Sequence, residues 1–192
     1  MINYNQISAP IEIFSLRFVI IYALSVALLI VSSKIQVPMI PVPITFQTAV
    51  ILLIPALFGM KANLSVLSSW LFLGVLGAPV FASPVGIPGL AYFIGPTGGY
   101  FVGFVMAAVI TAFVIHTLKL KSLMPLISLF LLMHALILFT GWVWLSYGIP
   151  QLGVEKAWLA GVFPFLTGSV LKSAFVLAIV YPAFREKTSA AH

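Results

Sequence analysis

The chain has 192 residues, of which 62% are hydrophobic and only 6% charged, and its formal net charge is +6. A soluble globular domain carries about a quarter charged residues, so this composition excludes that class and predicts a polytopic integral membrane protein of one domain. Cysteine is absent, which excludes disulfides and thiolate metal sites. The positive charges are spread along the chain, so they indicate membrane topology rather than nucleic-acid binding.

The apolar runs predict an all-α fold with six membrane-spanning helices. The expected spans are residues 13–33, 45–59, 62–78, 97–118, 123–147 and 167–184. The first is too long and lacks the cleavage pattern of a signal peptide. The second and third are close to the lower length limit for a bilayer about 30 Å thick. Segment 158–165, interrupted by Gly161 and Pro164, is predicted to be a partial or interfacial segment.

The basic residues separate onto two sides of the predicted bundle. One side holds Arg17, Lys61, Lys119, Lys121, Arg185 and Lys187, and the other holds Lys34 and Lys156. Because positive charge concentrates on the cytoplasmic side, both termini are predicted to be cytoplasmic. The outward connections, 34–44, 79–96 and 146–157, are then the long Pro/Gly-rich ones. Irregular backbone at membrane depth persists only where protein buries it or it lines a cavity, so we expect a pocket or lid on the outer side.

The segment Gly95–Phe104 combines small residues with a helix start. Residues at every fourth position, namely Gly95, Gly99, Gly103, Ala107 and Thr111, predict a stripe that lets another helix pack closely. Pro96 suits a first helical turn, and the N–H groups of residues 97–99 are expected to be free to anchor a polar group. Tyr100 follows. The alternative is that this turn serves packing alone.

Lys172 lies about five residues into the last expected span. A lysine at the centre of a membrane helix costs roughly 3 kcal/mol on insertion scales. The chain has only three acids, none within a span, so an anionic or strongly polar ligand would complete this site. The alternative is that Lys172 extends to the lipid headgroups. Ser169 lies one turn earlier and Thr167 close by; their hydroxyls suit either a ligand or backbone carbonyls.

The remaining polar and aromatic residues give weaker indications. His134, in the fifth span, is interpreted as a neutral packing residue rather than a proton relay, because no chain of acids accompanies it. His116 and His192 lie far apart in sequence, so no metal site is expected. The aromatic residues Trp142, Trp144, Tyr147 and Trp158 suit an interfacial belt, although one of them could line a pocket wall.

Motifs for enzymatic chemistry are absent from the sequence. It has no G-x-x-x-x-G-K-[ST], no G-x-S-x-G and no H-E-x-x-H. We therefore expect neither an enzyme nor an ATPase, and no cofactor. A second pair of small residues, Ala23 and Ala27, suits packing inside the bundle or against another subunit.

Five blocks in order together resemble the BioY family, the biotin-binding S-components of energy-coupling-factor (ECF) vitamin transporters. The blocks are Pro41–Thr48, Leu71–Ala82, Gly95–Phe104, Gly141–Leu145 and Pro164–Lys172. The resemblance covers almost the whole chain. It implies six helices in the ECF S-component fold, residing in a bacterial cytoplasmic membrane.

The resemblance also implies how such a protein works. Biotin would be captured on the outer side, with the first outer loop, including Pro41 and Pro43, as a gate. A transmembrane coupling protein and two ATPases would drive import, with Ala23 and Ala27 docking on the coupling protein. The residues expected to contact the ligand are Lys172, Ser169, Tyr100, Ser83, Gln47 and Trp144.

The sequence departs from the family pattern at two places. Ser169 stands where the family usually has an aspartate that contacts the ureido ring of biotin, and a neutral hydrogen bond is about half as strong as a charge-assisted one. The loop 82–86 also lacks the usual glycine-rich run. The alternatives are a self-sufficient carrier for biotin or another small carboxylate, an S-component for a related vitamin, and a structural subunit without ligand.

Overall fold

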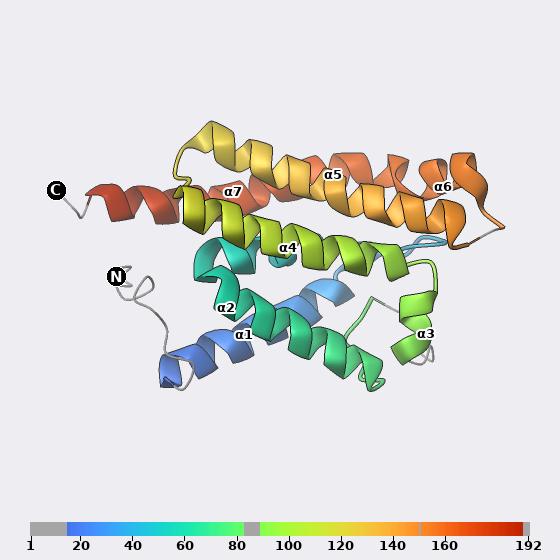
Figure 1. Cartoon of the computed structure of the whole chain (residues 1–192), viewed down its shortest axis with the longest axis horizontal. Coiled ribbons are helices and arrows are strands. Elements are labelled where there is room, and N and C mark those ends of the chain that lie inside the picture. The colour runs from blue at the N-terminus through green and yellow to red at the C-terminus, as the bar shows by residue number, and fades with distance from the viewer. Residues whose placement is uncertain (1–14, 83–88, 150, 190–192) are drawn as a thin grey trace.

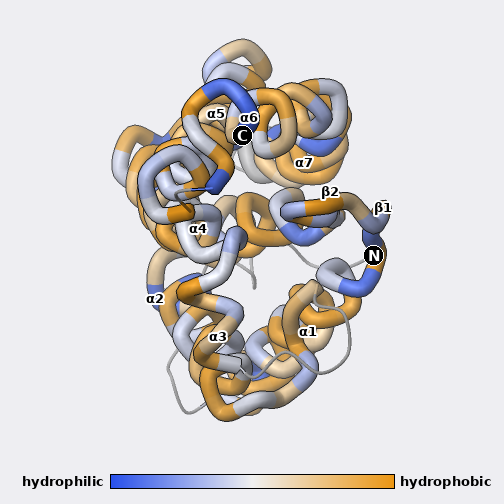
Figure 2. The backbone as a smooth tube through the Cα atoms, turned by 90° about the vertical axis from the view of Figure 1, so that its right-hand side faces the viewer, coloured by the Kyte–Doolittle hydropathy of each residue, from blue (hydrophilic) through white to orange (hydrophobic). Residues whose placement is uncertain are grey.

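The computed structural model of the chain describes residues 15–82, 89–149 and 151–189, and most of these lie in helices that run along one long axis (Figure 1). Within the described residues, five stretches are long and apolar enough to cross a membrane. They are Leu16–Lys34, Gln47–Val75, Gly98–Leu118, Leu123–Tyr147 and the combined stretch Gly153–Arg185. Hydrophobic residues, coloured orange in Figure 2, predominate along most of these helices. The predicted class, an all-α integral membrane protein, is confirmed.

Helix α1 (Leu16–Lys34) lies at the edge of the bundle and packs on α2 (Figure 1). It begins at Ser15, whose Oγ accepts a hydrogen bond from the N–H of Phe18 at 3.2 Å, as an N-cap residue does. Its inner face buries Ser25 and Leu29, whereas the opposite face leaves large apolar side chains such as Leu24 exposed. One face of α1 is therefore left uncovered by the other described residues.

Helix α2 (Gln47–Val75) is bent where the sequence predicted two separate spans, 45–59 and 62–78. Its backbone leaves the helical conformation at Gly59, with φ 79° and ψ −171°, a conformation that glycine adopts without steric cost. His116 Nε2 lies 3.0 Å from the carbonyl oxygen of Pro55, one turn before the bend. The two arms diverge from this point in Figure 1. The division of the chain into a single domain of six spans stays a prediction.

Helices α4 (Gly98–Leu118) and α5 (Leu123–Tyr147) pack side by side through small residues. A Cβ added at Gly99 would overlap Trp144 Cβ and the carbonyl oxygen of Thr140, and one added at Gly103 would overlap the Thr140 hydroxyl. The close packing expected of this stripe is therefore present. The prediction that Gly95 belongs to this helical stripe is wrong, because Gly95 precedes α4 and lies in the turn before it.

Short elements gather at the end of the bundle where α1 ends and α4 begins (Figure 1). They are the antiparallel ribbon of β1 (Gln36–Val37) and β2 (Ile44–Thr45), helix α3 (Gly89–Ile94), helix α6 (Gly153–Gly161) and the 3₁₀ turn η2 (Phe163–Phe165). The ribbon was not predicted. Helix α6 and η2 cover the segment 158–165 that was expected to be partial or interfacial.

Helix α7 (Leu166–Ser189) closes the bundle against α5 and α2 and runs to the opposite end. The start of α1, the bend of α2, the α4–α5 connection and the end of α7 all lie at that end (Figure 1). This is the arrangement that the sorting of basic residues predicts for a cytoplasmic side. That assignment stays a prediction, as no membrane defines the two sides.

Candidate ligand-binding cavity

A cavity lies inside the half of the bundle that holds the β ribbon. Its walls are mainly apolar, and several are aromatic, including Phe81, Phe101, Phe104 and Phe165. Its polar lining residues are Thr45, Gln47, Thr48, Tyr92, Thr97, Tyr100, His134, Ser169 and Lys172. Apolar walls with a few polar groups are typical of a site that orients a small organic ligand.

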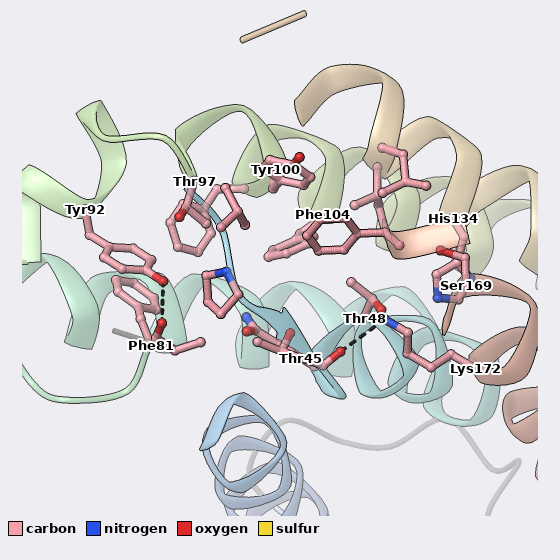
Figure 3. A pocket seen from close by; sticks show the side chains of 18 residues that line it. Thr45, Thr48, Phe81, Tyr92, Thr97, Tyr100, Phe104, His134, Ser169 and Lys172 are labelled. Carbon is pink, nitrogen blue, oxygen red and sulfur yellow. Dashed lines mark hydrogen bonds between the residues drawn. The ribbon is translucent and has the colours of Figure 1, made fainter. Parts of the chain in front are cut away.

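The cavity has a basic end. Helix α7 places Ser169 and Lys172 one turn apart, and Figure 3 shows both beside His134, away from Tyr92 and Thr97 at the other end. Lys172 is only 8% exposed, and its Nζ donates to the carbonyl oxygen of Thr45 at 3.0 Å. The alternative that Lys172 reaches the lipid headgroups is therefore wrong.

Lys172 has no countercharge among the described residues that line the cavity. No acidic side chain is among the described residues that line it, and the whole chain has only three acids. A buried charge costs free energy unless it is paired and hydrogen-bonded. A ligand that offers hydrogen-bond acceptors to the ammonium group would therefore bind favourably.

His134 also lines this end, which the sequence analysis did not predict. Its Nδ1 lies 3.0 Å from the carbonyl oxygen of Phe130 and 2.9 Å from Ser173 Oγ, so the ring is hydrogen-bonded as expected of a packing histidine. Its Nε2, however, is buried and has no hydrogen-bond partner in the described part of the chain, and the same is true of Thr48 Oγ1. Helical spacing offered a signal, because Ile137 and Leu138 follow His134 by three and four residues and line the same wall.

Tyr100 and Gln47 line the cavity in different ways. The ring of Tyr100 contributes to the wall, while its hydroxyl donates to the carbonyl oxygen of Gly161 at 2.6 Å and so ties α4 to α6. Gln47, the first residue of α2, is 3% exposed and lines the cavity. Both positions agree with the expectation of ligand contact, and that role stays a prediction.

Trp144 is not among the residues that line the cavity, contrary to expectation. Its indole Nε1 donates to the carbonyl oxygen of Gly95 at 2.9 Å, and its side chain lies against Gly98 and Gly99. Trp144 therefore packs in the interface between α4 and α5 and not in the cavity wall. Ser83, the remaining expected contact, lies outside the described residues.

A second, outer cavity of about 780 Å³ adjoins the first. The β1–β2 connection and the α3–α4 turn line it, and it shares Pro43, Ala82, Tyr92 and Thr97 with the inner cavity. Pro41 lines only the outer cavity. The connection that carries these prolines therefore lies between the inner cavity and the outer one, which is where a gate would be needed.

Tyr92 stands at the junction of the two cavities. Its hydroxyl donates to the carbonyl oxygen of Ala82 at 2.9 Å, and its ring stacks on Phe81 with centroids 5.1 Å apart. Burial raises the pKa of this phenol, more than the Thr97 side chain lowers it. Tyr92 is therefore a neutral donor that fixes the wall segment 81–82.

Ala23 and Ala27 lie on α1 and line neither cavity. Both are exposed on this chain. The possibility that they pack inside the bundle is therefore wrong, and a contact with another subunit remains available to them.

A bundle of apolar helices that buries a polar-ended cavity beneath an external loop defines a membrane protein that binds a small molecule. The family model described as "BioY family" matches residues 5–189, so the chain belongs to the BioY family.

Individual relatives agree with this assignment. The chain is 35% identical over 158 residues to a "Probable biotin transporter BioY" of Pyrococcus horikoshii, covering 82% of this chain and 90% of that protein. It is 29% identical to "Biotin transporter BioY2" of Lactococcus lactis, with 80% and 82% covered. A solved structure described as the S-component for biotin from an ECF-type ABC transporter superposes with a TM-score of 0.77 at 25% identity, over 91% of this chain and 94% of the other. The predicted ECF S-component fold is confirmed.

Proposed function

We propose that this chain captures biotin on the outer side of a bacterial cytoplasmic membrane and delivers it inward as the substrate-binding subunit of an ATP-driven ECF transporter. The single observation that carries the proposal is the cavity with Lys172 at its inner, basic end. Biotin has a polar ureido ring, an apolar thioether ring and an acyl chain. These parts match a cavity that is aromatic along its walls and polar at one end.

Transport requires more than this cavity. The sequence lacks the phosphate-binding loop of an ATPase, so the energy would come from partner subunits. A transmembrane coupling protein and two ATPases would supply it. We assign the exposed face of α1 that carries Ala23 and Ala27 to the coupling protein, because no described residue covers its apolar side chains.

Uptake of labelled biotin tests the proposal. We expect a biotin-auxotrophic host to accumulate biotin only when this chain is expressed with its coupling protein and ATPases. An ATPase variant with an inactivated phosphate-binding loop should abolish accumulation. Uptake by this chain alone, in a host that lacks such partners, would favour the self-sufficient carrier instead. Competition by unlabelled related vitamins would show whether another vitamin is the preferred ligand.

A further inference from the structure

His134 lines the cavity and has a buried ring nitrogen that no other described residue pairs. The residue is 2% exposed and lines the basic end of the cavity beside Lys172 (Figure 3). Its Nε2 has no hydrogen-bond partner among the described residues. Leaving a buried polar atom unpaired costs about 1–3 kcal/mol, so a ligand group that satisfies Nε2 would gain affinity.

The other ring nitrogen determines what Nε2 can do. Nδ1 lies 3.0 Å from the carbonyl oxygen of Phe130, which can only accept a hydrogen bond, so Nδ1 carries the hydrogen. Ser173 Oγ, 2.9 Å from the same nitrogen, can act as a second acceptor. A neutral imidazole has one N–H, and a second buried cation beside Lys172 would lack a countercharge. Nε2 is therefore a hydrogen-bond acceptor.

The basic end thus offers a donor and an acceptor together. The ammonium group of Lys172 donates and Nε2 of His134 accepts. A carboxylate only accepts, so it would leave Nε2 unsatisfied. A cyclic urea has a carbonyl flanked by N–H groups and matches both side chains at once, and the only N–H groups of biotin are in its ureido ring.

We infer that His134 Nε2 accepts a hydrogen bond from a ureido N–H of biotin while Lys172 donates to the ureido oxygen. This inference rests on the proposed function. It also sets the orientation of the ligand: the ureido ring lies at the basic end, and the acyl chain with its carboxylate points towards the outer cavity, which is large enough to admit an extension.

Two substitutions separate ligand contact from packing. The amide of His134→Gln reaches about as far as Nε2 and retains an acceptor there, whereas His134→Asn reaches only to about Nδ1. We expect His134→Asn to raise the Kd for biotin about 10–100-fold and His134→Gln to raise it much less. His116→Asn is the matched control, because it removes an imidazole that lines neither of these two cavities, and it should leave the Kd nearly unchanged. Equal, wild-type affinity in both His134 variants would overturn the inference.

Ligand analogues test the orientation on the unaltered protein, so the test survives if a variant fails to fold. Biocytin, which is biotin extended at its carboxylate, should bind, and one of the two mono-N-methyl ureido analogues should bind about 10–100-fold more weakly than biotin. Exclusion of biocytin, or equal binding of both N-methyl analogues and biotin, would overturn the inference while leaving the proposed function intact. A folded wild-type protein that binds no biotin would instead overturn the proposed function.

Discussion

At the scale of single residues, one buried cation dominates the candidate site. Lys172 is hydrogen-bonded to a backbone carbonyl and faces a cavity whose described lining has no acid. Its position inside a span made it identifiable from the sequence, because an intramembrane lysine is costly and needs a reason. His134 could not be identified in the same way. Its role depends on which nitrogen faces the cavity, and only the positions of Phe130 and Ser173 determine that.

Replacing Lys172 by methionine tests the role of its charge. Lys172→Met keeps the length of the side chain and removes its charge, so the fold should persist. We expect biotin binding to weaken by about 1.5–3 kcal/mol, the range for hydrogen bonds to charged groups, as measured by calorimetry on purified protein. Lys156→Met is the matched control, since Lys156 is exposed on α6 and lines neither cavity. Unchanged affinity in a well-folded Lys172→Met protein would remove this residue from the site.

At the scale of elements, α4 and α5 form the closest packing that the sequence pattern predicted. The spacing of Gly99, Gly103, Ala107 and Thr111 was sufficient to predict it, because these residues share one helical face and all are buried. The bend at Gly59 and the β ribbon could not be predicted in this way. A lone glycine in an apolar run is compatible with a straight helix, and the ribbon consists of two residues per strand.

A bulky residue at Gly99 tests this packing. Gly99→Leu would place a side chain into Trp144 Cβ and the Thr140 carbonyl, both of which belong to the packed helix α5. We expect a large loss of folded protein in detergent, seen as aggregation in size-exclusion chromatography. Val102→Leu is the control, since Val102 lies on the same helix and is 55% exposed, so that a larger side chain there should be tolerated. A Gly99→Leu protein that folds and binds biotin would mean that α4 and α5 can separate without cost.

At the scale of the whole molecule, the ligand cavity and the exposed face of α1 lie on different parts of the bundle. The sequence predicted the helical membrane fold because hydropathy shows which segments are apolar enough to cross a bilayer. The direction in which they cross, taken from the basic residues, stays a prediction. The sequence predicted the cavity less well. Trp144 belongs to the helix interface rather than the wall, and this distinction depends on how α5 is rotated against α4.

Bulky residues on α1 should separate capture from transport. Distant sites act nearly independently, so a protein carrying Ala23→Trp and Ala27→Trp should bind biotin normally when purified alone. In cells with the coupling protein and ATPases, it should neither import biotin nor co-purify with them. Phe113→Trp, at an exposed position on α4, controls for bulk alone. Normal import by the double variant would show that transport does not need this face, and would favour the self-sufficient carrier.

Equilibrium binding of biotin to the purified, biotin-depleted chain without partner subunits is the most direct test of the account. The cavity is formed within one chain, so we predict saturable binding of one biotin per folded chain, with Lys172→Met weakening it and Lys156→Met leaving it intact. A folded, monodisperse protein that binds no biotin in the absence of partners, or whose binding is indifferent to Lys172, would contradict the assignment of this cavity as the capture site.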